Sequence, residues 1–211
     1  MKRSIILYLV TGVALFTACT KTPEEKAEVL IKKSLKYKLM LSESYAPMET
    51  TIDSAFAPFD DPVFYARTME WCSLAITMDE LEKKEKKALS SMAIWEGDHQ
   101  SAYGKARYEE EKAKHDAILA QMEEVIKQGA EKYAKLVEES KGERRFIGFV
   151  IRHHYSARNI MYNKMEFGAY EYIVDNDIKN VIAEYDMNGN EYKIVHQVYD
   201  KLVSGDGWAE E

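Results

Sequence analysis

Cysteine is scarce in this chain, with only Cys19 and Cys72 among its 211 residues. If Cys19 carries lipid, as argued below, Cys72 is left alone and no internal disulfide can form. The fold must then be stabilised by helix packing and by burial of an apolar core. Cys72 follows Trp71 in an apolar stretch with no neighbouring group that would lower its pKa. We therefore predict an inert, buried thiol.

Basic charge is also in short supply. The chain has 29 lysines and arginines against 36 acids, a net charge of −7, and loss of Lys2 and Arg3 with a leader makes it −9. Phosphate binding needs a basic surface, so this composition argues against a nucleic-acid partner. Long apolar runs are missing as well. A helix that spans a bilayer needs about 20 apolar residues, and the run at residues 5–16 falls short of that.

Motifs for catalysis, cofactors and metals are missing too. The sequence has no glycine-rich phosphate loop, no Gly-x-Ser-x-Gly and no Cys/His cluster with metal spacing. His153 and His154 are adjacent, so on a strand they point to opposite faces and cannot easily share a metal. We predict no catalytic, cofactor-binding or metal-binding residues and a non-enzymatic protein. An envelope enzyme with no recognisable motif stays open as an alternative.

A leader is predicted at the N-terminus. Basic residues 2–3, the apolar run at residues 5–16 and the small residues before Cys19 are typical of a signal peptide over residues 1–18. Residues 15–19 resemble a bacterial lipobox, in which the cysteine thiol receives a diacylglycerol and the new amine is acylated. The resemblance implies lipid attachment at Cys19 and stable membrane anchoring by its acyl chains, palmitate among them. The alternative is an ordinary secretory leader that leaves Cys19 as a spare thiol.

The first mature helix is predicted directly after Cys19. Thr22 is expected as the N-cap, Pro23 as the first helical residue and Glu25 as the residue that completes a capping box. Apolar residues at i+4 spacing continue this helix to about residue 43. Residues 45–62 hold three of the four prolines and show no strong period. We expect an irregular connection that wraps the body there, with a short helix around residues 52–56 as an alternative.

A long, charged helical hairpin is predicted over about residues 62–140. Its first arm has an apolar stripe at heptad-like spacing: Phe64, Trp71, Leu74, Met78, Leu81, Glu85, Ala88, Met92 and Trp95. Its second arm has a matching stripe: Tyr108, Lys112, His115, Leu119, Met122, Ile126, Gly129, Tyr133 and Leu136. Gly97 and Asp98 mark the turn between the arms. Such stripes pack either within one chain or between two, and both remain open.

The C-terminal part of the chain is β-prone. Residues 146–155, 165–174 and 181–185 are predicted as three strands, and a helix follows that ends at Gly205. The predicted fold class is therefore α+β and mostly helical: an N-terminal helix, a long antiparallel helical hairpin, then a small three-stranded antiparallel sheet with a C-terminal helix. The predicted organisation is a signal peptide (1–18), a helical region (19–142) and a sheet-plus-helix region (143–211) packed with the helical region as one unit.

Tyrosine is concentrated in this C-terminal part, where seven of the fourteen fall after residue 154. Tyr170 and Tyr172 lie on the same face of the second predicted strand. If that face is exposed, the two residues form a candidate interaction surface. If the last helix covers it, they belong to the core. We favour the core, because a three-stranded sheet needs an element packed on it.

The mature chain resembles the uncharacterised lipoproteins of gut Bacteroidota, which carry a domain of unknown function. The resemblance rests on the lipobox, the helix that leads to residues 45–54, the charged hairpin and the β-rich end that begins at residues 146–148. It implies an outer-membrane lipid anchor, with the body in the periplasm or on the cell surface, and it assigns no activity. We predict a non-enzymatic binding or structural module with an unknown protein partner. An immunity-type lipoprotein that neutralises a toxin is the alternative, since an acidic body suits a basic toxin.

Overall fold

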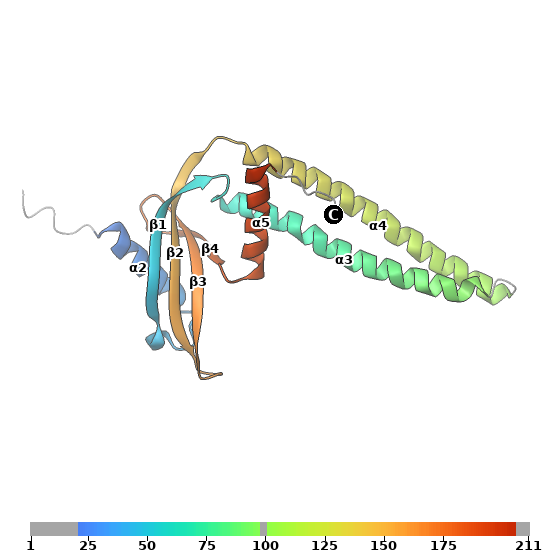
Figure 1. Ribbon diagram of the computed structural model, residues 1–211, viewed down its shortest axis with the longest axis horizontal. Coiled ribbons are helices and arrows are strands. Elements are labelled where there is room, and N and C mark those ends of the chain that lie inside the picture. The colour runs from blue at the N-terminus through green and yellow to red at the C-terminus, as the bar shows by residue number, and fades with distance from the viewer. Residues whose placement is uncertain (1–20, 98–100, 206–211) are drawn as a thin grey trace, which may run out of the picture. The chain divides into compact units, whose positions relative to one another are not determined.

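The computed structural model describes residues 21–97 and 101–205. The predicted signal peptide, Cys19 and Asp98 lie outside the described residues. The elements, in chain order, are α2 (Pro23–Leu35), a short 3-10 turn η1 (Ser42–Ser44), β1 (Ala46–Ala57), α3 (Pro62–Glu96), α4 (Ala102–Ser140), β2 (Arg145–Asn159), β3 (Lys164–Val174), β4 (Val181–Asp186) and α5 (Asn190–Ser204), as Figure 1 shows. The chain is α+β and mostly helical, with a long helical hairpin, as predicted.

The chain forms two compact units whose segments alternate along the sequence. Among the described residues, the sheet unit combines residues 21–55 with 147–188, and the hairpin unit combines residues 56–97 and 101–146 with 189–205. The predicted boundary after residue 142 therefore falls inside the hairpin unit. The C-terminal helix α5 belongs to the hairpin unit, whereas the N-terminal helix α2 belongs to the sheet unit.

The sheet has four antiparallel strands in the order β1-β2-β3-β4, not the three that the sequence predicted. The missing strand is β1, which we expected to be an irregular connection. Its prolines stand at the margins: Pro47 is the second residue of the strand and Pro58 follows its last residue. Proline is tolerated at such positions of an edge strand, so proline density was a poor guide here.

Helix α2 covers one face of the sheet. Its capping box forms as predicted, because the Thr22 hydroxyl accepts from the Glu25 N–H at 3.3 Å and the Glu25 carboxylate accepts from the Thr22 N–H at 3.1 Å. Ala27, Ile31 and Leu35 of α2 pack on the sheet in the main core cluster. The helix ends at Leu35 rather than near residue 43, because the chain turns there to enter β1. A smaller core cluster lies on the opposite face, around Ala55, Val150 and Ile173.

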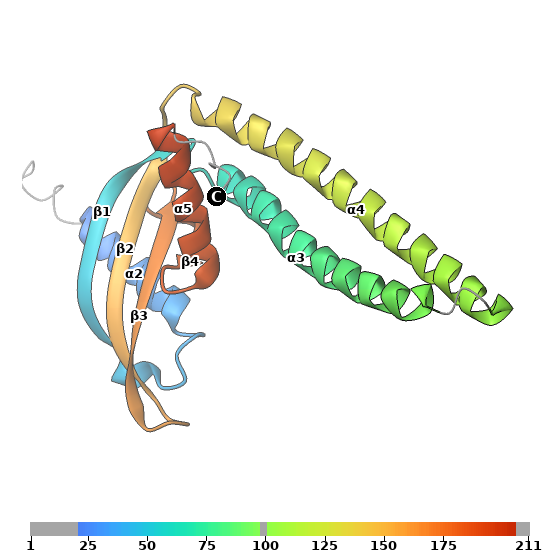
Figure 2. The same cartoon turned by 45° about the vertical axis from the view of Figure 1, so that its right-hand side comes forward.

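In the hairpin unit, α3 and α4 pack side by side along their length (Figure 2). Asp61 caps α3 and Pro62 is its first residue, as predicted. The indole N–H of Trp71 donates to the Gly129 carbonyl at 3.0 Å, and its ring packs on Tyr133. At the base of the hairpin, α5 contributes to a third core cluster, which consists of Phe64, Leu136, Val195 and Tyr199.

The predicted stripe of α3 is confirmed, since all nine of its positions are buried or half-buried. The stripe of α4 was predicted partly out of phase. Lys112, Leu119 and Ile126 are exposed, and the residues that face α3 are their predecessors Glu111, Ile118 and Val125. In two of these three adjacent pairs, Ile118/Leu119 and Val125/Ile126, both residues are apolar. The pattern alone was therefore ambiguous, and packing against α3 decided it.

Candidate functional site

A buried histidine lies on the α2-facing side of the sheet. His153 is 1% exposed, with the Tyr45 hydroxyl 2.8 Å from its Nε2 and the Thr50 hydroxyl 2.8 Å from its Nδ1. Burial lowers the pKa of His153, and the neighbouring His154 lowers it further. The ring is therefore neutral at pH 7, so one ring nitrogen donates and the other accepts. Both nitrogens have hydroxyl partners, which makes His153 a structural residue of the core.

Tyrosine rings continue this cluster across β2 and β3. The Tyr155 ring stacks on His153 and on Tyr170, with centroids 5.9 and 6.2 Å apart. Burial raises the pKa of Tyr155 and of Tyr172 to about 12, so both hydroxyls stay protonated at neutral pH. The row of rings forms a stiff, layered core face under α2.

The two tyrosines of the candidate interaction surface have different environments. Tyr172 is 1% exposed and belongs to the core cluster that α2 covers, so it is not accessible to a partner. Tyr170 is half-buried, and the Lys38 ammonium lies 4.2 Å from its ring centroid. The face is thus core, as we favoured, but the helix that covers it is α2 and not the last helix.

A cavity of about 360 Å³ opens beside Tyr170, and its lining includes Lys38, Tyr155, Glu166 and Asp186. Lys38 forms an ion pair with Glu184. Burial lowers the pKa of Lys38, while the charge of Asp186 acts in the opposite direction. The lining therefore carries charges of both signs, and its one lysine is already held by Glu184 and by the ring of Tyr170.

The most unusual surface of the sheet unit is the turn between β2 and β3, which we call the apolar tip. Turns are normally made of polar residues. Here the turn carries Ile160, Met161 and Tyr162, and the start of β3 adds Met165 and Phe167. Their exposed fractions are 57, 73, 67, 52 and 69%, in that order. Clustered apolar side chains that face water mark an interaction site.

Hydrogen bonds of Asn159 and Arg158 brace the turn of the apolar tip. The Asn159 side-chain oxygen accepts from the backbone N–H of Met161 at 2.9 Å and of Tyr162 at 3.4 Å. The Asn159 amide donates to the Glu166 carboxylate at 2.8 Å. The Arg158 side chain also bonds Asn163, which has a left-handed backbone conformation (φ 49°). These bonds constrain the backbone of the turn that carries the apolar side chains.

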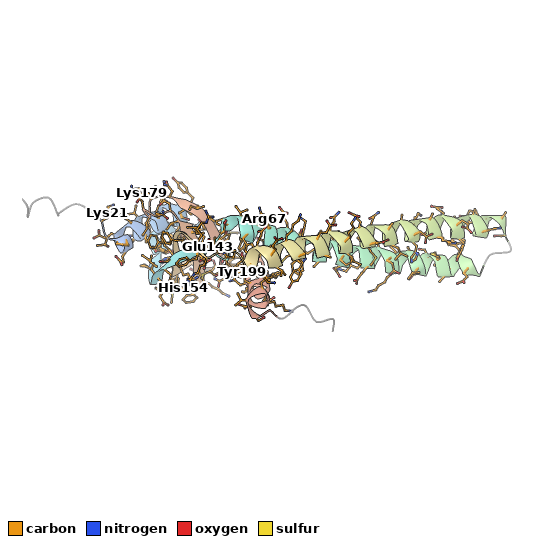
Figure 3. All side chains as sticks on the ribbon, turned by 90° about the horizontal axis from the view of Figure 1, so that it is seen from above. Lys21, Arg67, Glu143, His154, Lys179 and Tyr199 are labelled. Carbon is orange, nitrogen blue, oxygen red and sulfur yellow. The ribbon has the colours of Figure 1, made fainter. Side chains whose placement is uncertain are left out.

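The apolar tip and the start of α2 lie at opposite ends of the sheet unit. The Lys26 ammonium donates to the Asp177 carbonyl at 3.0 Å, which places the start of α2 at the β3–β4 turn. In Figure 3, which looks roughly along the strands, Lys21 and Lys179 lie on the same side of the sheet unit. Strand β3 runs from the apolar tip to that turn over 11 residues, a length of about 36 Å at the usual rise per residue.

Sequence reasoning missed the apolar tip. Its signal was present, since an apolar triplet at residues 160–162 stands between Asn159 and Asn163, two residues typical of turns. A strand was expected to end near residue 155 and the next to begin at residue 165, which left this triplet without an assignment. In the structure β2 continues to Asn159, which pairs with Lys164 of β3. Residues 160–162 therefore lie in the turn that connects the two strands.

The other predicted residues are placed as follows. His154 follows His153 on β2, so the two point to opposite faces. Cys72 is half-buried, and burial raises the pKa of its thiol, in agreement with an inert residue. Within residues 21–97 and 101–205, no group of three or more His, Cys, Asp or Glu side chains could hold a metal ion. None of the described helices is both long and apolar enough to cross a bilayer.

Comparison with known proteins does not add to this picture. No protein-family model, no curated protein and no solved structure matches the chain.

Proposed function

We propose that this protein is a lipid-anchored lipoprotein of the bacterial envelope, a non-enzymatic binding module that docks a partner protein through the apolar tip. The single observation that carries the binding role is the set of five exposed apolar side chains on the turn held by Asn159 and on the start of β3. Burying such side chains against a partner contributes about 25 cal/mol per Å² of apolar surface. A preorganised turn loses little conformational entropy when it binds.

The anchor is proposed from the leader and the lipobox-like residues 15–19, with lipid on Cys19 in the outer membrane. Helix α2 begins at Pro23, only four residues after Cys19. So short a connection would keep the start of α2, and with it the β3–β4 turn, close to the membrane. The apolar tip would then face away from the anchored end, where a partner protein can reach it and the anchoring bilayer cannot.

Site-specific photocrosslinking in intact cells tests this function. A photoreactive amino acid at position 161 should give a protein adduct of discrete mass, because the side chain lies in the proposed contact. The matched control carries the same amino acid at position 179, in the turn at the opposite end of β3, and should not give that adduct. A variant with Ile160→Ser and Tyr162→Ser should lose the adduct from position 161. Its stability should change by less than about 0.5 kcal/mol, because the substituted side chains are exposed.

Two outcomes would count against the proposal. An adduct with lipid alone at position 161 would mean that the apolar tip inserts into a membrane. Equal adducts from positions 161 and 179 would mean that the crosslinks report only crowding in the envelope.

A further inference from the structure

Strand β1 forms one edge of the sheet, and none of the described strands pairs with its outer side. The strand order places β1 at the end of the sheet, and residues 46–51 are all exposed. An edge strand offers a row of unpaired N–H and C=O groups to any other extended chain. Natural edges are usually protected by lysine, proline or a bulge. β1 has Pro47 near its start and no lysine, and it continues with the β-prone residues 50–52.

A groove runs beside this open edge, on the α2-facing side of the sheet. Its volume is about 360 Å³, and its walls are Glu24, Glu28 and Ile31 of α2 and Pro47, Thr50 and Ile52 of β1. Tyr45 and His153 form its floor, where they are held together by the hydrogen bond described above. Side chains from a strand paired to β1 would alternate between this groove and the opposite face.

Both faces of the edge are acidic. Glu24 and Glu28 border the groove, while Glu49 and Asp53 lie on the other face, where Asp53 bonds Arg152 at 3.1 Å. Glu28 is paired with Lys32 at 2.5 Å. Glu24 and Glu49 have no ion pair within the described part of the chain. The open edge is therefore bordered by uncompensated negative charge on each face.

We infer that β1 binds an extended segment of another protein, rich in lysine or arginine, as a fifth strand of the sheet. The main chain of the segment pairs with β1, and its basic side chains contact Glu24 on the groove side and Glu49 on the other side. This surface is separate from the apolar tip, so the inference does not depend on the proposed function.

Charge disfavours a second copy of this chain as the occupant. In an antiparallel pairing of two β1 strands centred on Thr51, Glu49 of each copy lies opposite Asp53 of the other. Like charges directly opposite each other destabilise a strand pair. A basic segment meets complementary charge at the same positions.

Peptide binding to the purified full-length protein in detergent micelles tests the inference. The probe is a fluorescent ten-residue peptide in which pairs of lysines alternate with pairs of threonines, so that lysines point to both faces of the paired strand. Its counterpart has glutamate in place of lysine. Fluorescence anisotropy should show binding of the lysine peptide, and the glutamate peptide should bind about tenfold more weakly or not at all. Hydrogen exchange should show that the bound lysine peptide protects backbone amides of residues 46–55.

A charge-reversed variant, Glu24→Lys with Glu49→Lys, should weaken binding of the lysine peptide by about tenfold or more. The matched control, Glu82→Lys with Glu123→Lys, makes the same change in net charge at exposed positions of α3 and α4, and it should change the affinity by less than about twofold. Both variants alter exposed side chains only, so both should fold.

Four outcomes would overturn the inference. They are equal binding of the two peptides, protection outside residues 46–55, equal weakening by both charge variants, and a peptide-free dimer in which these amides are already protected. The last result would mean that a second copy occupies the edge.

Discussion

Tyr155 and Gly168 are opposite residues of β2 and β3, and their contact requires glycine. A Cβ built on Gly168 would lie 2.2 Å from the Tyr155 ring, well inside van der Waals contact. The ring in turn stacks between His153 and Tyr170 and has little room to move. The absence of one methyl group thus lets the row of aromatic rings close over the sheet.

We predict that Gly168→Ala lowers the free energy of unfolding by about 1–3 kcal/mol, because the ring must leave its place or the strands must separate. Gly97→Ala is the matched control, since a Cβ there meets nothing within 4 Å. That control should leave stability unchanged or slightly raised, because alanine has less backbone entropy to lose. Urea unfolding followed by circular dichroism measures both. Equal stability of the two variants would mean that the contact with Tyr155 is not tight.

His153 gives stability a defined pH dependence. Burial lowers its pKa in the folded protein below the ordinary value of 6.5, so the unfolded chain binds more protons than the folded one. Stability should be fully present above about pH 6.5 and should fall as the pH decreases from there toward the folded pKa. Urea midpoints at pH 7.5 and 5.5 test this. The variant His153→Gln should show a smaller fall between these values, and an equal fall would assign the effect to other groups.

At the scale of elements, the seam of the α3–α4 hairpin carries a polar pair. Glu85 and His115, which interrupt the predicted stripes, meet with His115 Nε2 3.5 Å from a Glu85 carboxylate oxygen. Their side chains are 21 and 16% exposed. The two interruptions therefore match each other across the seam. A polar pair in a helical seam specifies the alignment of the helices and costs stability relative to apolar residues.

We predict that the double substitution Glu85→Leu and His115→Leu raises the free energy of unfolding by about 1 kcal/mol or more, because apolar packing replaces a pair that loses its hydration. The control removes an exposed pair of α3, Asp79→Ala with Lys83→Ala. It should change stability by less than about 0.5 kcal/mol, as expected for a surface ion pair. Thermal unfolding followed by circular dichroism compares them. A less stable leucine variant would show that the pair contributes net stability.

At the scale of the whole molecule, the proposed lipid on Cys19 decides whether the protein stays at the membrane. We predict that Cys19→Ala abolishes labelling with a radioactive fatty acid and moves the protein out of the membrane fraction, because the acyl chains supply the anchoring free energy. Cys72→Ala is the matched control and should keep both the label and the membrane fraction. If fully processed Cys19→Ala protein remained in the membrane, the lipobox interpretation would be wrong.

Protease treatment of intact cells then assigns the side of the outer membrane. Loss of the wild-type protein from whole cells would place the sheet and hairpin units at the cell surface. Resistance in whole cells, followed by digestion after the outer membrane is permeabilised, would place them in the periplasm. The partner of the apolar tip would be sought accordingly among surface or periplasmic proteins.

Local signals in the sequence were enough to predict where α2 and α3 begin and that the long helices form a hairpin. The capping box at Thr22, the proline at the start of α3 and the heptad spacing act through neighbouring residues, and they correctly predicted where α2 and α3 begin and that α3 and α4 form a hairpin. Strands β3 and β4 were also predicted to within a residue or two, because their apolar runs are bounded by turn residues.

Contacts between segments far apart in the chain decided the features that the sequence did not predict, such as strand β1 and the seam of α4. β1 is a strand because β2 lies beside it, and its own residues are too exposed to show an alternating pattern. Glu111, and not Lys112, is the buried residue of α4 at this level of the hairpin, and packing against α3 decides between them. The sequence by itself thus determined the starts of α2 and α3 and the hairpin, whose causes lie within a few residues. The fourth strand, the covering of Tyr172 by α2 and the exposure of the apolar tip depend on segments far apart in the chain, so only the tertiary structure decided them.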